Sequence, residues 1–317
     1  CHNRVNCAYT LTPGSFGFQF FVARAKLRAA VTGNAATQPP APGAPSQVRA
    51  ARVARRGVSL DTGLIAALAL LAVAWVGIEC RAVPEKAKGP VAASTVLVAV
   101  AATIAAASRS APAQNVWLAA GVTALLSTGI LVLDAALGIP FGKMRYMDAA
   151  GPRIFGLVPW AMPLVWVAVV LNARGVARLI MRPWRKSQNY GLWVMGVAAF
   201  LAASFDLGLE VFASRLGRFW VWETRPGLPT WYGAPVSSAI GWLMGTLLIL
   251  AFVTPLLINK RGTGSHHRSG TQPLAIWIVL SVMLASVAAV HGLWLGAAVI
   301  IAFTVVTSAL AIYGASW

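Results

Sequence analysis

Acidic side chains are scarce in this chain. Only eight of its 317 residues are Asp or Glu, against 26 Lys and Arg, and all charged residues together make up 11%. Soluble domains rarely combine so few charges with a hydrophobic content of 58%. The three cysteines, Cys1, Cys7 and Cys80, have no metal-ligand spacing and form no disulfide framework. These shortages exclude a soluble globular domain and a cysteine-based metal site.

The sequence also lacks the common cofactor motifs. It contains no G-x-G-x-x-G, no Walker A sequence and no H-E-x-x-H, so we expect no nucleotide, flavin or metal cofactor. A net charge of +18 is typical of nucleic-acid binding. However, most Lys and Arg residues fall before the first apolar stretch and in alternate loops, as in positive-inside topology. We therefore expect anionic lipid headgroups, and no nucleic acid, as partners of the basic loops.

Long apolar stretches are what the sequence has in abundance. A bilayer core of about 30 Å needs about 20 apolar residues per helix. Eight stretches fit: 60–78, 90–108, 115–138, 154–173, 190–213, 236–258, 273–290 and 292–313. Only His291 and Gly292 separate the last two, so seven or eight helices are expected. The predicted fold is an all-α polytopic membrane bundle, in a prokaryotic cytoplasmic membrane with the N-terminus cytoplasmic.

The first 57 residues differ from the rest. They are rich in Pro, Ala and Arg and show no sustained apolar period, which predicts disorder. The chain begins at Cys1 and its first Met is Met144, so part of this segment is a candidate for non-native sequence. Residues 58–317 are expected to form the membrane domain.

Three acidic residues fall inside apolar stretches, where an ionisable group is costly and is a functional candidate by default. They are Asp134, Asp206 and Glu210. Asp206 and Glu210 are four residues apart and share one helix face. Two like charges at that depth are expensive unless one carboxyl keeps its proton. We interpret the pair as functional.

Aromatic residues are expected at the same end of the bundle as nearly all the acids. With a cytoplasmic N-terminus, the non-cytoplasmic side holds every acidic residue except Asp61, together with 219–223 and 231–235. An interfacial aromatic belt would explain the Trp and Tyr residues but not the acids. A carboxyl beside indole faces suits acid catalysis through a carbocation, because the acid gives the proton and π faces stabilise the cation.

Four blocks between about 130 and 245 resemble the carotenoid biosynthesis protein family, whose characterised members are CruF-type carotenoid 1,2-hydratases. Residues 138–146 (GIPFGKMRY) resemble G-x-P-F-G-x-Y-x-Y, and 156–166 resemble its G-V-P…P-L-x-W helix. Residues 206–210 (DLGLE) followed by 220–222 (WVW) resemble D-L-x-x-D-P and W-x-W. Residues 231–242 resemble Y-F/Y-G-V-P-x-x-N-F-x-G-W. Three departures mark a divergent member: Met144 for Tyr, Glu210 for Asp and Ser238 for Asn.

The resemblance implies hydration of a terminal isoprenoid double bond in a long acyclic carotenoid, without a cofactor. Asp206 or Glu210 would be the general acid, and the other carboxyl or Asp134 would orient and deprotonate water. Substrate contacts are expected from Tyr146, Trp166, Trp220, Trp222, Glu223, Trp231, Tyr232, Ser238 and Trp242. Membrane lipid and other carotenoid-pathway enzymes are the expected neighbours.

Two other classes remain open at this stage. A carotenoid cyclase or isomerase would use the same cation and differ only in its fate. A lipid or small-molecule transporter would leave the acids without a chemical task unless it is proton-coupled, and its usual internal repeat is not evident.

Overall fold

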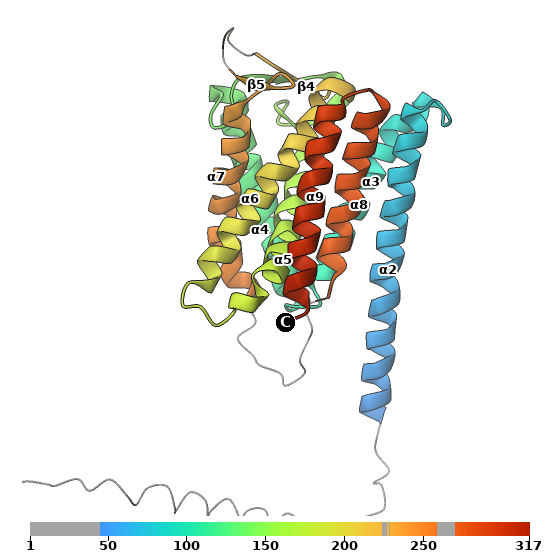
Figure 1. The fold of residues 1–317 in the computed structure, drawn as a ribbon, viewed down its shortest axis with the longest axis vertical. Coiled ribbons are helices and arrows are strands. Elements are labelled where there is room, and N and C mark those ends of the chain that lie inside the picture. The colour runs from blue at the N-terminus through green and yellow to red at the C-terminus, as the bar shows by residue number, and fades with distance from the viewer. Residues whose placement is uncertain (1–44, 224–226, 228, 259–269) are drawn as a thin grey trace, which may run out of the picture. The chain divides into compact units, whose positions relative to one another are not determined.

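The computed structural model describes residues 45–223, 227, 229–258 and 270–317, with side chains described from Leu60 onward. Within these ranges, eight helices are long and apolar enough to cross a membrane. The prediction of a polytopic helical bundle is therefore confirmed, with eight helices (Figure 1): α2 (Pro45–Glu79), α3 (Lys88–Ala107), α4 (Ala113–Leu137), α5 (Ala161–Ile180), α6 (Tyr190–Glu210), α7 (Val236–Val253), α8 (Gln272–Val290) and α9 (Trp294–Ala315).

Some helix boundaries differ from the predicted ones. The stretch expected to begin at 154 starts at Ala161, because residues 153–159 form a hairpin of β2 (Arg153–Ile154) and β3 (Val158–Pro159). Helix α2 begins at Pro45, inside the segment predicted to be disordered through residue 57, whose last part is rich in the good helix formers Ala and Arg. Residues 1–44, with Cys1 and Cys7, lie outside the described residues.

Helix α5 occupies the middle of the bundle. It packs against α3, α4, α6, α8 and α9, and most of its length is buried. Helices α8 and α9 lie side by side and are joined by the short turn at His291–Leu293. The two final stretches are therefore separate helices (Figure 1).

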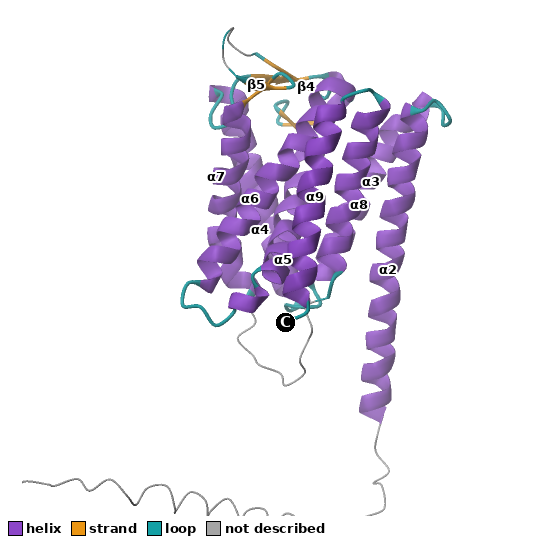
Figure 2. Cartoon of the chain, viewed as in Figure 1, coloured by secondary structure: helices purple, strands orange, loops and turns teal. Residues whose placement is uncertain are grey.

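Short strands cover one end of the bundle (Figure 2). Strand β1 (Met144–Tyr146) pairs antiparallel with β4 (Trp220–Trp222), with Tyr146 opposite Trp220 and Met144 opposite Trp222. Strand β5 (Thr230–Trp231) pairs with β6 (Ala234–Pro235) just before α7. The β1–β4 pair ties the loop after α4 to the loop after α6. Sequence blocks far apart in the chain thus meet above the ends of these helices.

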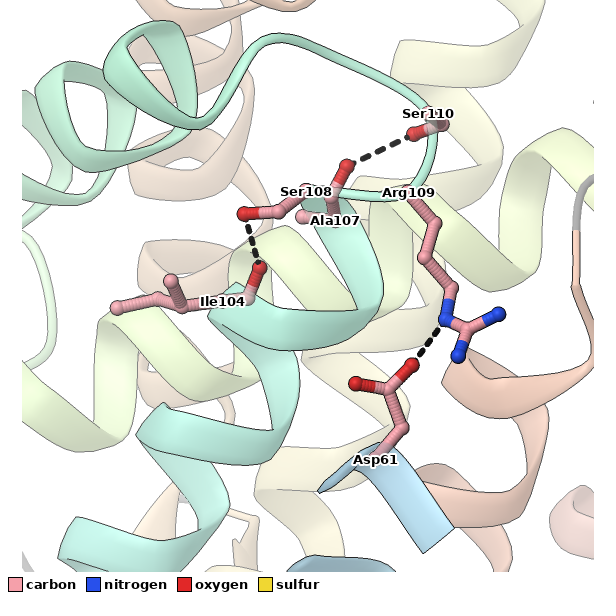
Figure 3. Close-up of polar contacts among 6 residues, drawn as sticks. All are labelled: Asp61, Ile104, Ala107, Ser108, Arg109 and Ser110. Atoms are coloured by element: carbon pink, nitrogen blue, oxygen red, sulfur yellow. Dashed lines mark hydrogen bonds and ion pairs between the residues drawn. The ribbon is translucent and has the colours of Figure 1, made fainter. Parts of the chain in front are cut away.

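The opposite end contains the one acidic side chain that the sequence separates from the others. Asp61 of α2 is buried and forms an ion pair with Arg109, in the turn between α3 and α4 (Figure 3). In the same turn, the hydroxyls of Ser108 and Ser110 donate hydrogen bonds to the carbonyls of Ile104 and Ala107, respectively. The turn is therefore closed by its own hydrogen bonds and anchored to α2 by charge.

Candidate active site

The two carboxyls of α6 lie together at the end covered by the strands. Asp206 and Glu210 are 1% and 3% exposed. One oxygen of Glu210 accepts hydrogen bonds from the indole N–H groups of Trp220 and Trp222, at 3.1 and 2.9 Å. The β1–β4 pairing holds both indoles over the helix end. Immediately after Glu210 the chain continues as a π-helix, Val211–Leu216, a local widening often found at functional sites.

Ser238 of α7 links the two carboxyls. Its Oγ lies 3.3 Å from Asp206 Oδ2 and 3.3 Å from Glu210 Oε1. A hydroxyl has one hydrogen and can donate it to only one acceptor at a time. If Asp206 is protonated, it can donate to Ser238, which then donates to Glu210, and every contact has a donor. The geometry therefore favours one shared proton along Asp206, Ser238 and Glu210.

Asp134 lies at the end of α4 and holds the loop that follows. It is buried, and one of its oxygens accepts the backbone N–H groups of Phe141 and Gly142, at 2.9 and 3.4 Å. Its other oxygen has no partner among the described residues. These bonds place the Phe141 ring edge-on to Trp166, with ring centroids 6.0 Å apart. Asp134 thus positions one wall of the site.

Aromatic rings surround the carboxyl pair. Trp166 of α5 and Trp242 of α7 stack with centroids 4.0 Å apart and planes 6° from parallel. Tyr146 packs edge-on to Trp220, and its hydroxyl has no hydrogen-bond partner among the described residues. Burial raises the pKa of Tyr146, and the nearby Asp134 and Glu210 raise it further. The hydroxyl therefore keeps its proton.

Glycines on α7 make room for these rings. A Cβ at Gly245 would lie 2.9 Å from the Trp166 indole, and one at Gly241 would overlap the Phe141 ring. Since the two glycines are four residues apart, they lie on one face of α7 and leave it without side chains there. The rings rest against that face.

A small cavity lies between the carboxyl and the rings. Its volume is about 10 Å³, which is the lower limit for holding one water molecule. Glu210 and Ser238 are the polar groups in its wall apart from indole nitrogens. The remaining lining residues are apolar or aromatic: Leu131, Phe141, Met144, Met162, Trp166, Trp220, Trp222 and Trp242.

A larger cavity of about 390 Å³ adjoins the small one. Its wall comes from α2, α3, α5, α6, α8 and the strand-side loops, and is almost entirely apolar. Thr95 supplies a hydroxyl, but that group already donates to the Val91 carbonyl and accepts from Trp75. Met162 and Trp220 line both cavities. An apolar ligand in the large cavity would therefore meet the carboxyl site at these two side chains.

Three predicted contact residues lie apart from this cluster. Trp231 donates its indole N–H to the Leu207 carbonyl, and the Tyr232 hydroxyl accepts the Gly296 N–H. Both side chains pack in a separate small cluster and line neither cavity. Glu223 is exposed. Six of the other predicted residues line the small cavity: Trp166, Glu210, Trp220, Trp222, Ser238 and Trp242. Asp206, Asp134 and Tyr146 lie behind this wall, in contact with Ser238, Phe141 and Trp220 respectively.

Sequence reasoning missed the apolar wall of the larger cavity. Phe205, Leu209 and Phe212 contribute to it from α6 and the π-helix, and Trp75 contributes from α2. Phe205 and Leu209 directly precede Asp206 and Glu210, but apolar residues in a membrane helix carry no signal that separates a lining residue from a lipid-facing one. Met162 was likewise not identified.

Eight helices of membrane-spanning length and apolarity define a polytopic integral membrane protein, and its candidate site is a pair of buried carboxyls beside a water-sized cavity. Residues 91–307 match the model of the carotenoid biosynthesis protein family, and the chain belongs to that family. It is similar to the bisanhydrobacterioruberin hydratase of Haloarcula japonica, with 31% identity over 140 residues. The match covers 44% of this chain and 45% of that hydratase, so the chain spans less than half the length of this curated relative. No solved structure matches the chain.

Proposed function

We propose that the protein hydrates the terminal isoprenoid double bond of an acyclic carotenoid end group, as a cofactor-independent carotenoid 1,2-hydratase. The observation that carries the proposal is that a small cavity beside the buried Glu210 shares two wall residues, Met162 and Trp220, with a large apolar cavity. The small cavity has room for one water molecule beside Glu210 and Ser238. The large cavity is apolar, of a size typical of small-ligand pockets, and suits an end group.

Glu210 is the proposed reacting carboxyl, because it lines the small cavity whereas Asp206 lines neither cavity. Glu210 delivers the proton shared along Asp206, Ser238 and Glu210 to the less substituted alkene carbon. The π electrons form the new C–H bond and leave a tertiary cation. A lone pair of the water forms the C–O bond, and the surplus proton of that water returns to Glu210. The net change is the addition of one water molecule, and the carboxyls are restored.

The surrounding rings fit this cation chemistry. Trp220 and Trp222 use their N–H groups on Glu210, so their faces remain available as non-nucleophilic π surfaces. Asp206 and Ser238 act as positioning residues that hold the proton. Asp134 fixes the Phe141 loop rather than touching the reacting atoms. In the membrane, we propose a cytoplasmic N-terminus, which places this site at the non-cytoplasmic side.

Expression in a host that makes lycopene or γ-carotene tests the proposal. A hydratase yields a product heavier by the mass of one water molecule. An isobaric product would instead indicate a cyclase or isomerase, and an unchanged pigment would indicate a transporter. Loss of the Glu210 carboxyl should lower product formation by about 10²–10⁴-fold, the usual contribution of a general acid.

The variant to compare is Glu210→Gln, whose amide oxygen can still accept the two indole N–H groups. Glu85→Gln is the matched control, since Glu85 is an exposed acid that lines neither cavity. Equal product from the Glu210→Gln variant, the control and the unaltered chain at equal expression would refute the assignment of Glu210.

A further inference from the structure

A third cavity, with two arginines in its wall, lies at the opposite end of the bundle from the carboxyl pair. Its volume is about 40 Å³, and its walls come from α3, α5, the 3₁₀ segment Thr254–Leu257 that follows α7, and the start of α8. One water molecule needs about 10–15 Å³ of such space. The cavity therefore has room for about three waters or one small oxyanion. The carboxyl site contributes no residue to it.

Several polar atoms around this cavity are buried without a partner. Asn172 is 2% exposed and Arg174 7%. Within the described residues, four of these atoms have no hydrogen-bond partner: the amide oxygen and nitrogen of Asn172, Nε of Arg174 and the hydroxyl of Thr103. Buried polar groups in folded proteins are nearly always paired. Three neighbouring residues with unmet hydrogen bonds indicate a bound molecule.

The charge at this cavity is unbalanced. Arg174 and Arg178 are one helical turn apart on α5, and both line the cavity. All eight acidic residues of the sequence lie in the described ranges, and the ion pairs formed there involve neither arginine. The nearby Arg109 differs, because it is paired with Asp61 (Figure 3). The cavity arginines therefore need a counter-ion from outside the chain.

One of the two arginines is held by a hydrogen bond, and the helix between them is closely packed. Arg178 donates to the Ser110 hydroxyl at 3.3 Å. Ser110 in turn donates to the Ala107 carbonyl at 3.1 Å (Figure 3). Gly175 lies between the two arginines, and a Cβ there would be 2.8 Å from Pro273 of α8. Direct contact between α5 and α8 thus closes one wall. These contacts fix the walls of the cavity, so it does not result from poor packing at a helix end.

We propose that this cavity binds a phosphate group. The planar forks of Arg174 and Arg178 match phosphate oxygens, with the amide of Asn172 and the hydroxyl of Thr103 as neutral donors. Free inorganic phosphate and the headgroup of an anionic phospholipid present the same chemistry. The site is separate from the proposed reaction and stands whether or not that reaction is correct.

Thermal unfolding of the full chain in an uncharged detergent tests this site. One arm replaces chloride by inorganic phosphate at constant ionic strength. The other adds phosphatidylglycerol to the micelles, with phosphatidylcholine as its zwitterionic control. Ligand at about ten times its Kd should raise the midpoint by about 2 °C. A rise with phosphate identifies the free anion as a source, and a rise with phosphatidylglycerol alone identifies the lipid.

Variants connect the rise to the cavity. Arg178→Ala and Arg174→Lys should each remove at least half of it, the latter because an ammonium lacks the two-pronged geometry. Arg185→Ala, which deletes an exposed charge near the same end, should keep the full rise. If Arg174→Lys does not fold, the Arg178→Ala variant decides the result, because Arg178 is only half-buried and its replacement is better tolerated. The proposal is overturned if neither arm stabilises the unaltered chain, or if Arg185→Ala abolishes the rise as fully as Arg178→Ala.

Discussion

Ser238 joins the two buried carboxyls through one hydroxyl, so deleting that hydroxyl tests whether the pair works as a unit. In the Ser238→Ala variant both carboxyls lose a contact of 3.3 Å. A hydrogen bond to a charged group is worth about 1.5–3 kcal/mol. If that contact holds the proton for transfer, the rate should fall by about 10- to 150-fold. Initial rates of hydrated carotenoid formation in membranes with equal amounts of protein measure this change.

Controls separate a positioning role from a merely structural one. Ser238→Thr retains a hydroxyl and should recover most of the rate. Ser204→Ala removes a hydroxyl of α6 that donates to the Phe200 carbonyl one turn back and lines neither cavity, so its rate should match that of the unaltered chain. A folded Ser238→Ala protein with at least half of the original rate would show that the carboxyls do not act through this hydroxyl.

Three further predictions concern the walls of the site. Gly245→Ala should reduce the rate by about tenfold, a barrier increase of ~1.4 kcal/mol, because its methyl would press on Trp166 from 2.9 Å. Ala93→Trp places an indole in the large cavity and should raise the KM for the carotenoid by about tenfold, ~1.4 kcal/mol of binding. Burial raises the pKa of Tyr146 above its ordinary value of 10.0, so the stability it contributes is present below pH 10 and is lost as the pH rises further. Tyr146→Phe should therefore lessen the fall of the thermal midpoint above pH 10.

Each of these predictions has a matched comparison. Gly129→Ala adds the same methyl to α4, where nothing lies within 4 Å, and should leave the rate unchanged. Leu125→Trp adds an indole on an exposed surface and should not change KM. Tyr313→Phe alters an exposed tyrosine and should not change the alkaline midpoint. Equal effects in a variant and its control would contradict the proposed wall contacts.

The sequence predicted the bundle because bilayer thickness imposes a length on each helix. It also identified Asp206 and Glu210, since their i, i+4 spacing places them on one face whatever the surroundings. The pairing of Tyr146 with Trp220 was not predictable, because two loops separated by helices α5 and α6 must meet to form it. The need for glycine at position 245 was not predictable either, since it follows only from the position of the Trp166 ring against α7.

The start of α5 shows a different limit of sequence reasoning. Hydropathy alone predicted a helix from residue 154, and Val158 and Pro159 are apolar enough to belong to one. Gly156 has φ +71°, a left-handed conformation that interrupts a helix, and the hairpin around it moves the helix start to Ala161. The helix consequently extends to Ile180 and contains Arg174, a residue that the sequence alone placed in a cytoplasmic loop.

Trp220 has the central place in the proposed reaction, because it touches every part of it. Its N–H holds Glu210, its ring packs on Tyr146, and its surface lines both cavities. In the proposed reaction the acid and the water both lie on the small-cavity side, so a cation forms only where the end group lies against this indole. Capture by water therefore requires the end group to advance to the wall formed by Trp220 and Met162. An end group that stops short of that wall would meet neither the acid nor the water, so in the proposed reaction the position of this wall sets whether the end group reacts.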